Sequence, residues 1–255
     1  MNIGFEYIKY RWNAKGRHGI HSPFVFDLLD KCLKIQFSKE DREELNDLFT
    51  ALKTDSRSIE IEDFGAGSKK LSNFRAIPKI FKTSSSKGKY GKLLYQLARF
   101  HQFKHVLEFG TSLGVGTCYL QLGSPKAKIT TVEACKNTRE IALESFKMLE
   151  LENIESIRST FDEFLVEKPA TKYDLIYIDG HHDGEALLRY MNELKENKHD
   201  ETIFILDDIR WSKSMYKAWN KIVDSEHYHV TIDFFRFGVA VPRNHQVKEH
   251  FTLKL

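Results

Sequence analysis

The sequence is poor in cysteine: its 255 residues include only Cys32, Cys118 and Cys135. Their odd number and the lack of a CxxC spacing argue against both a disulfide framework and a zinc site. Free thiols are typical of proteins kept in a reducing compartment. We therefore expect a cytoplasmic protein.

A long apolar run is also lacking. No stretch of about 18 uncharged apolar residues occurs, so the sequence predicts no transmembrane helix. The first residues, "MNIGFEYIKYRW", lack the apolar core of a signal peptide. We expect a soluble, intracellular protein without membrane insertion.

Neither sign of charge dominates the chain. The 39 basic residues nearly balance the 36 acidic ones, and the formal net charge of +3 gives no reason to expect a nucleic-acid partner. Hydrophobic residues make up 41% of the sequence, enough to bury one sizeable core. The sequence thus predicts one main domain with an N-terminal extension, and it leaves a homodimer open.

The pattern of the chain changes near residue 87. Before it lie segments with apolar residues at helical spacing, such as "SPFVFDLLDKCLKI", where Ser22 is a plausible N-cap and Pro23 falls in the first turn. We predict a helical extension over residues 1–83 that could cover a substrate site as a lid. The main domain is expected over residues 84–255.

Beyond residue 87, short β-rich runs alternate with helix-like stretches. The β-rich runs are "HVLEFG", "KITTVEA", "IESIRST", "YDLIYIDG" and "TIFILDDI". Such alternation predicts parallel strands joined by helical crossovers, with helices on both faces of a sheet. The end differs, because "YHVTIDFF", "RFG" and "VAVPR" are typical of a terminal antiparallel hairpin. The predicted fold class is α/β with a mostly parallel sheet.

A glycine-rich segment follows the first of these runs: residues 106–117 are "VLEFGTSLGVGT". Ligands of open α/β sheets bind at the carboxyl ends of the strands, where glycines let the backbone approach a cofactor. The spacing from Gly110 through Gly114 to Gly116 is GxxxGxG and not GxGxxG, so NAD loses support. A P-loop is also disfavoured, because a P-loop needs a lysine followed by Ser or Thr after its glycines. Here Val115, Gly116 and Thr117 stand at that place.

With "ITTVEA" after it, "LEFGTSLGVGT" resembles the cofactor-binding half of class I S-adenosylmethionine-dependent methyltransferases, in the branch similar to catechol O-methyltransferase. The resemblance covers roughly residues 84–242 and implies a Rossmann-like sheet of seven strands with S-adenosylmethionine as cofactor. It implies that Glu133 binds the ribose hydroxyls, since a carboxylate accepts two hydrogen bonds from a diol, and that Glu108 lies near the methionine end. The other residues expected to contact the cofactor are Gly110, Thr111, Ser112, Gly114, Ala134, Thr160, Phe161, Asp179 and His181, with Thr160 and Phe161 near adenine.

Plain alternatives stand beside these assignments. Glu133 could be an exposed acid at a strand end, and Phe161 could be a core aromatic. The segment "IEDFGAGSKK" at 60–69 also offers an acid and two glycines. It is followed by Pro78 and by no second strand that ends in an acid, so we interpret it as a turn of the extension.

Polar residues crowd the ends of the fourth and fifth expected strands. Asp179, His181, His182 and Asp183 follow the fourth, and "ILDDIRW" ends the fifth. In metal-dependent relatives an Asp and an Asp-Asn pair at these places hold magnesium. The resemblance therefore implies Mg²⁺ or another divalent cation on Asp179, Asp207 and Asp208, although Asp208 replaces the Asn. In the alternative, Asp179 orients the cofactor and Asp207 caps a loop.

A catalytic base is implied three residues after Asp179, where the catechol branch has a lysine and this chain has His182. Imidazole titrates near neutral pH, so His182 could deprotonate a hydroxyl acceptor, with Asp179 as the second catalytic residue. Alternatively, the histidine pair contacts the cofactor or caps the next helix. The segment "NAKGRHGIHSPF", with Arg17, His18 and His21, is either a recognition loop or an ordinary surface loop.

The function predicted from the sequence is methylation of a small-molecule hydroxyl by S-adenosylmethionine. Within the same enzyme class, a nitrogen acceptor or a macromolecular acceptor is the alternative. From another class, the chain could bind the cofactor without turnover. The acidic cluster and His182 favour catalysis, because a pure binding module needs neither.

Overall fold

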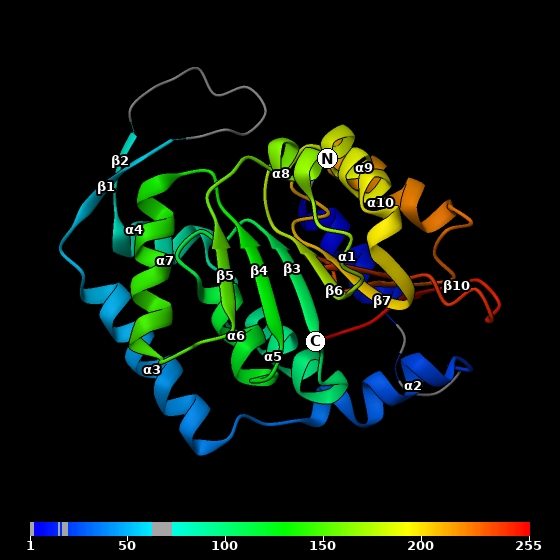
Figure 1. Cartoon of the computed structure of the whole chain (residues 1–255). Helices are drawn as coiled ribbons and strands as arrows, with labels where there is room; N and C mark the ends of the chain where they lie inside the picture. Colours follow the sequence, from blue (N-terminus) through cyan, green and yellow to red (C-terminus); the bar gives the residue numbers. More distant parts are fainter. Residues whose placement is uncertain (1–2, 15, 17–19, 63–72) are drawn as a thin grey trace.

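The computed structural model describes residues 3–14, 16, 20–62 and 73–255 (Figure 1). Arg17 and His18 of the suggested recognition loop lie outside these residues. So does most of the segment 60–69 that we interpreted as a turn. None of the helices in the described part of the chain is long and apolar enough to cross a membrane.

In the described residues, eight strands form the central sheet, in the order β10-β8-β9-β7-β6-β3-β4-β5. Five of them are mutually parallel and carry the crossover helices. They are β3 (His105–Phe109), β4 (Lys128–Val132), β5 (Ile154–Ile157), β6 (Tyr173–Ile178) and β7 (Lys198–Leu206). Because the strand order reverses between β3 and β6, the carboxyl ends of these two strands define the switch point where open α/β sheets bind ligands.

The terminal hairpin is confirmed, with β8 (Val230–Asp233) and β9 (Gly238–Val241) antiparallel to each other and β9 antiparallel to β7. The expected count of seven strands is corrected by β10 (Glu249–Thr252), which pairs in parallel with β8 at the sheet edge. Its four residues, "EHFT", carry one buried aromatic, Phe251, so the pattern was too short to predict a strand.

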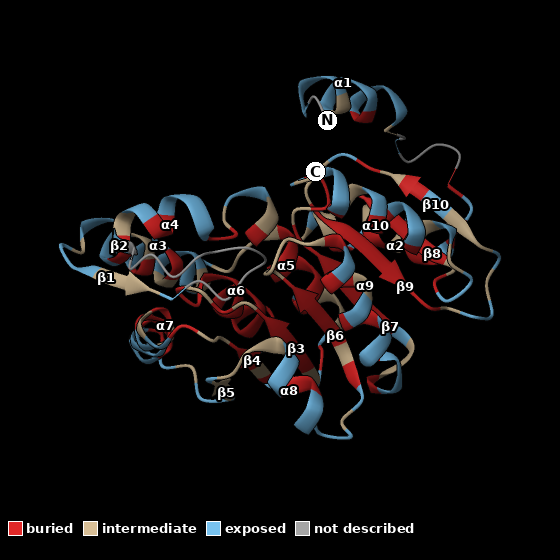
Figure 2. Ribbon diagram, turned by 90° about the horizontal axis from the view of Figure 1, so that it is seen from above, coloured by how far each residue is buried: buried red, intermediate tan, exposed pale blue. Residues whose placement is uncertain are grey.

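Helices cover both faces of the sheet, as the alternation predicted. Val106 of β3 packs in the core cluster that includes residues of α5 (Lys89–His101), α6 (Val115–Gly123) and α7 (Lys136–Met148). Its neighbours Leu107 and Phe109 pack in the cluster formed with α8 (Phe161–Glu167), α9 (Gly184–Glu193) and α10 (Lys213–Asp224). In Figure 2 the inner strands are red, because both faces are buried. A short 3-10 turn, η2 (Lys195–Asn197), leads into β7.

The N-terminal segment packs on the α5 side of the sheet. It comprises α1 (Ile3–Asn13), α2 (Pro23–Asp30), η1 (Cys32–Lys34), α3 (Lys39–Thr54), β1 (Ser58–Ile61), β2 (Asn73–Ala76) and α4 (Ile77–Ser84). Ser22 caps α2, accepting from the Val25 N–H at 3.5 Å, with Pro23 in the first turn as expected. The pairing of β1 with β2 was not predicted. Buried leucines of α2 and α3 join the same core cluster as β3, so the extension and the sheet share one core.

Helix α1 stands apart from the other helices and is mostly exposed (Figure 2). Tyr10 is its buried contact, donating a hydrogen bond to the Leu253 carbonyl at 2.5 Å. The rings of Tyr7 and Tyr10 lie 5.0 and 5.2 Å from that of Phe235, in the β8–β9 connection. Thus α1 reaches the carboxyl edge of the sheet, where the expected site lies.

Candidate active site

The glycine-rich segment forms the turn between β3 and α6. Gly110 has a φ of +99°, and a Cβ added there would lie 1.9 Å from the Asp179 carbonyl oxygen. Gly114 has a φ of +80°, and its Cβ would lie 2.6 Å from the Phe146 ring. Both glycines are therefore required by the fold itself. We had assigned them to the close approach of a cofactor, a role that stays a prediction.

Glu108 lies beneath this turn, with only 1% of its surface exposed. Its Oε2 accepts hydrogen bonds from the hydroxyls of Thr117 at 2.5 Å and Thr131 at 2.7 Å. Thr131 also lies 2.6 Å from the Thr111 hydroxyl, so the two threonines link Glu108 to the turn. Burial raises the pKa of Glu108 to about 7, against the effect of the two hydroxyls.

A narrow cleft runs between the turn and the end of β6. It is lined by Ser84, Ser85, Ser86, Glu108, Gly110, Thr111, Ser112, Leu113, Val115, Gly116 and Asp179. Seven of these are residues of the glycine-rich segment, and Asp179 comes from the neighbouring strand end. The expected cofactor residues of the first and fourth strands thus share one cleft.

Glu133 directly follows β4 and is half-buried. Its two carboxylate oxygens accept from the backbone N–H groups of Ser112 and Cys135, each at 2.9 Å. Burial raises the pKa of Glu133, and the N–H groups of Cys135 and Ser112 oppose this shift. The carboxylate fixes the turn, including Ser112 in its left-handed conformation with φ +49°. It is therefore not a merely exposed strand-end acid, and Ala134 beside it is also half-buried.

The residues expected near adenine have structural partners. Thr160 caps α8 and exchanges hydrogen bonds with Glu163 in a capping box. Phe161 stacks on Phe109 at 4.7 Å and lies against Gly180, where a Cβ would be 2.9 Å from its ring. Phe161 is thus packed on one side and lies beside the strand end that carries Asp179, and its contact with adenine stays a prediction.

Two of the predicted acids meet beside the cleft. The Ser86 hydroxyl is 3.4 Å from Oδ2 of Asp179 and 3.2 Å from Oδ2 of Asp207. Tyr177 donates to the same oxygen of Asp179 at 2.8 Å. Burial and the nearby Asp207 charge raise the pKa of Asp179 well above its usual value. Sequence analysis missed Ser86 and Tyr177, because a buried Ser and a strand Tyr carry no pattern of their own.

Arg236, from the β8–β9 connection, binds this cluster. Its Nε donates to Oδ1 of Asp207 at 2.7 Å, and its Nη2 donates to Oδ2 at 2.5 Å. The same Nε lies 3.2 Å from Oδ1 of Asp208. Asp207 is completely buried at its side chain, so this forked pair is well shielded from water. The arginine was visible in the "RFG" turn, but only the sheet order places that turn beside Asp207.

His182 and His181 diverge in their contacts. His182 Nε2 lies 3.9 Å from Oδ2 of Asp208, and its ring is 5.4 Å from that of Trp211. Its buried Nδ1 has no hydrogen-bond partner among the described residues. His181 instead pairs its Nδ1 with the Tyr190 hydroxyl at 2.7 Å. Neither histidine caps α9, because Asp183 does so, accepting from two backbone N–H groups at 3.0 Å.

A cavity of about 560 Å³ opens on the far side of the acidic cluster. It is lined by Ile3, Tyr90, Asp208, Arg210, Trp211, Ser212, Lys213, Phe235 and Arg236. Three aromatic side chains and the cations Arg210, Arg236 and Lys213 form its walls. Arg210 is held by a buried pair with Asp233, in which Nη2 lies 2.5 Å from Oδ2. The cavity suits a small aromatic molecule.

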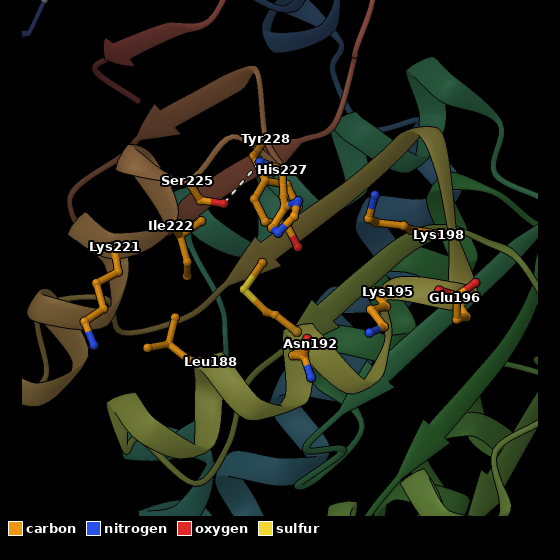
Figure 3. Close-up of a pocket in the computed structure, with 11 residues that line it drawn as sticks. Leu188, Asn192, Lys195, Glu196, Lys198, Lys221, Ile222, Ser225, His227 and Tyr228 are labelled. Atoms are coloured by element: carbon orange, nitrogen blue, oxygen red, sulfur yellow. Dashed lines mark hydrogen bonds between the residues drawn. The ribbon is translucent and has the colours of Figure 1, made fainter.

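A second cavity of about 410 Å³ lies between α9 and α10 (Figure 3). Its walls include Leu188, Asn192, Lys198, Ile222 and Tyr228. The His227 N–H donates a hydrogen bond to the Ser225 hydroxyl at 3.1 Å. Lys198 is the first residue of β7, so this cavity lies at the amino ends of the strands. The glycine turn and the acids lie at the carboxyl ends, and we assign the site there.

The metal expectation does not fit these contacts. Both oxygens of Asp207 are engaged by Arg236, which leaves no free oxygen pair facing Asp208. In the described part of the chain, the group with metal-ligand spacing is Asp200, Glu201 and His245, near the start of β7. Those acids already bind neighbours such as Arg243, and exposed acidic groups of this kind are common without an ion. The carboxylates at the strand ends are thus arranged for a guanidinium.

Comparison with known proteins agrees with this geometry. Residues 107–209, from β3 to the end of β7, match a family model described as a methyltransferase domain. A search of curated proteins gives no match. The matched range contains the glycine turn, Glu133 and all three acids.

Solved structures share the fold of most of the chain. S-adenosylhomocysteine-bound methyltransferase PaMTH1 of Podospora anserina is 14% identical, with a TM-score of 0.60 over 89% of this chain and 98% of that one. The O-methyltransferase TomG of Streptomyces achromogenes, in complex with S-adenosylmethionine, is 13% identical, with a TM-score of 0.58 over 86% and 96%. A putative caffeoyl-CoA O-methyltransferase of Staphylococcus aureus is 14% identical, with a TM-score of 0.57 over 64% of this chain and 88% of that one.

Residues 107–209 therefore match a methyltransferase domain, and the chain shares the Rossmann-like fold of methyltransferases. Two of these structures are described as O-methyltransferases, and the chain shares their fold.

Proposed function

We propose that this chain transfers the methyl group of S-adenosylmethionine to a hydroxyl oxygen of a small aromatic acceptor. One observation carries the proposal: a single acidic cluster separates two openings. Asp179 lines the narrow cleft at the glycine turn, while Asp208 and Arg236 line the wide aromatic cavity. Asp207 joins the two sides, since it contacts Ser86 beside Asp179 and also binds Arg236.

In this proposal the cofactor lies over the cleft, whose own open volume of about 10 Å³ is the size of a water molecule. Each oxygen of Glu133 accepts one backbone hydrogen bond and retains a second lone pair for a ribose hydroxyl. Glu108 lies deeper under the turn, toward the methionine end. Adenine would lie by Ala134, Thr160 and the exposed edge of Phe161. Asp179 and the segment up to His181 form the opposite wall of the proposed cofactor site.

The acceptor occupies the wide cavity, with its hydroxyl directed at the acidic cluster. Methyl transfer is a displacement at carbon: an oxygen lone pair forms the new C–O bond, and the C–S bond breaks with its electron pair left on sulfur. The hydroxyl proton must leave, and we assign it to His182, whose Nε2 lies 3.9 Å from Oδ2 of the cavity residue Asp208. Asp179, between cleft and cavity, positions the two reactants.

Isothermal titration calorimetry tests the cofactor part of the proposal. S-adenosylmethionine and S-adenosylhomocysteine should bind with one site per chain, and NAD should give no heat. A screen of S-adenosylhomocysteine release against phenols, other alcohols and amines then tests the acceptor. Release only with amines or macromolecules would move the activity to those acceptors. Tight binding without any turnover would reduce the chain to a binding module.

The environment of the protein forms part of the same proposal. All three cysteines are buried free thiols, in keeping with a cytoplasmic location. The homodimer and the absence of a nucleic-acid partner stay predictions from the sequence.

A further inference from the structure

The cluster of Asp179, Asp207 and Asp208 brings three carboxyl groups to one strand edge and needs a positive charge. Two of them contact one guanidinium: Arg236 lies 2.5 Å from Asp207 through Nη2 and 3.2 Å from Asp208 through Nε. The charge of Arg236 also acts on Asp179. A planar fork of this kind fixes both the distance and the direction of the cation.

A divalent ion would have to displace this arginine. Mg²⁺ requires oxygen ligands in near-octahedral geometry, and each oxygen of Asp207 already accepts at least two hydrogen bonds. Oδ1 accepts from Arg236 Nε and the Asp208 N–H, and Oδ2 accepts from Arg236 Nη2 and the Ser86 hydroxyl. The Asp207 side chain is fully buried, so its oxygens cannot turn to solvent to serve both partners. The displaced guanidinium would also remain close to an ion of like charge.

Arg236 keeps one nitrogen for a ligand. Nε and Nη2 donate hydrogen bonds to Asp207, and Nη2 also lies 3.4 Å from the Ser86 hydroxyl. Within the described residues, Nη1 has no hydrogen-bond partner, and Arg236 lines the wide cavity. The guanidinium lies over the Tyr90 ring at 5.5 Å, which holds its plane at the cavity wall.

We propose that Arg236 takes the place of the divalent cation, neutralising the acidic cluster and presenting Nη1 to the acceptor oxygen, so that methyl transfer proceeds without a metal ion. This assignment rests on the proposed function for the identity of the acceptor. It also bears on the substrate class: one aromatic hydroxyl is enough, because no pair of neighbouring hydroxyls has to chelate an ion. Arg236 only donates a hydrogen bond, and the proton of the hydroxyl goes to His182.

Titration of the full chain with Mn²⁺, by calorimetry and by thermal unfolding, tests the assignment without any substrate. The wild type should show no binding heat and no change in Tm at millimolar Mn²⁺. Arg236→Gln should unfold at lower temperature, and Mn²⁺ should restore part of the loss, because three carboxyl groups are left without their cation.

Arg210→Gln is the matched control, since Arg210 forms a similar forked pair with the single acid Asp233. It should also lower Tm, with no recovery in Mn²⁺. Arg236→Lys, which keeps the charge, should fold, and Mn²⁺ should give no binding heat and no change in its Tm. Stoichiometric Mn²⁺ binding by the wild type that Asp207→Asn abolishes would overturn the assignment. So would an Arg236→Gln variant that behaves like Arg210→Gln.

Activity gives a second arm. Once an acceptor is found, chelator should leave wild-type kcat unchanged. Arg236→Lys should lower kcat by roughly 10²-fold. The rate of this variant should also need a higher pH to rise than the wild-type rate does. An unchanged pH profile in this variant would remove Nη1 from the chemistry. If S-adenosylhomocysteine binds to no variant, the proposed function fails, and the Mn²⁺ titrations still decide whether Arg236 holds the cation position.

Discussion

Gly110 and Asp179 touch through their backbones: a Cβ on residue 110 would lie 1.9 Å from the carbonyl oxygen of Asp179. The contact joins the ends of β3 and β6, and Asp179 donates its N–H to the Phe109 carbonyl at 2.8 Å. The cofactor cleft lies between these two strand ends. The position of the proposed site is thus set by a contact that admits only glycine.

Gly110→Ala should therefore unfold more easily than the wild type, by more than about 2 kcal/mol, because it adds both a backbone clash and an unfavourable φ. Chemical denaturation followed by circular dichroism measures this loss. Gly16→Ala is the control, since no atom lies within 4 Å of a Cβ there. Equal stability of the two variants would show that β6 can move away at little cost.

Glu108→Gln should change how stability depends on pH. Burial raises the pKa of Glu108 from 4.5 to about 7, so the folded state holds this proton more tightly than the unfolded chain does. The associated stability is present below about pH 4.5 and is lost as pH rises to about 7, with a limit of about 3 kcal/mol. As pH rises across this range, thermal unfolding should show the Tm of the variant increasing relative to that of the wild type. Parallel curves would mean that Glu108 is ionised throughout.

His182→Ala should lower kcat by roughly 10²–10⁴-fold, because the acceptor proton loses its base. His181→Ala is the comparison: at saturating cofactor it should keep most of kcat, since the His181 imidazole bonds to Tyr190 instead of facing Asp208. Release of S-adenosylhomocysteine reports both rates. If His181→Ala loses as much as His182→Ala, the loop acts through its shape and not through a proton transfer.

Trp211→Ala should weaken acceptor binding and leave cofactor affinity unchanged. Trp211 is 68% exposed, lines the wide cavity and offers its ring to an aromatic ligand. Loss of one aromatic contact corresponds to about a tenfold rise in KM. Trp12→Ala, on the exposed α1, should leave KM unchanged. A changed Kd for S-adenosylhomocysteine in Trp211→Ala would place the acceptor elsewhere.

Much of this arrangement followed from local patterns. Alternating strand and helix segments predicted the parallel sheet, and an acid one residue beyond β4 singled out Glu133. Such signals lie within a few neighbouring residues. The strand ends also predicted that Asp179 and Asp207 would meet, because parallel strands end at one edge of the sheet.

The partners of those acids could not be predicted in this way. Ser86 is separated from Asp207 by 121 positions and from Arg236 by 150. Only the packing of α5 and the β8–β9 connection against the strand ends brings them together. For the same reason the sequence pattern at Asp207 and Asp208 reveals the negative charges but not Arg236, the counter-charge beside them.

The most direct test of the account is calorimetric titration of S-adenosylhomocysteine into the wild type, Glu133→Ala and Glu155→Ala. Glu133 follows β4 at the carboxyl edge, whereas Glu155 is an exposed acid within β5. We predict one site per chain in the wild type, affinity lowered by about 1–3 kcal/mol in Glu133→Ala, and no change in Glu155→Ala. No binding heat with S-adenosylhomocysteine, or tight binding of NAD in its place, would contradict the account.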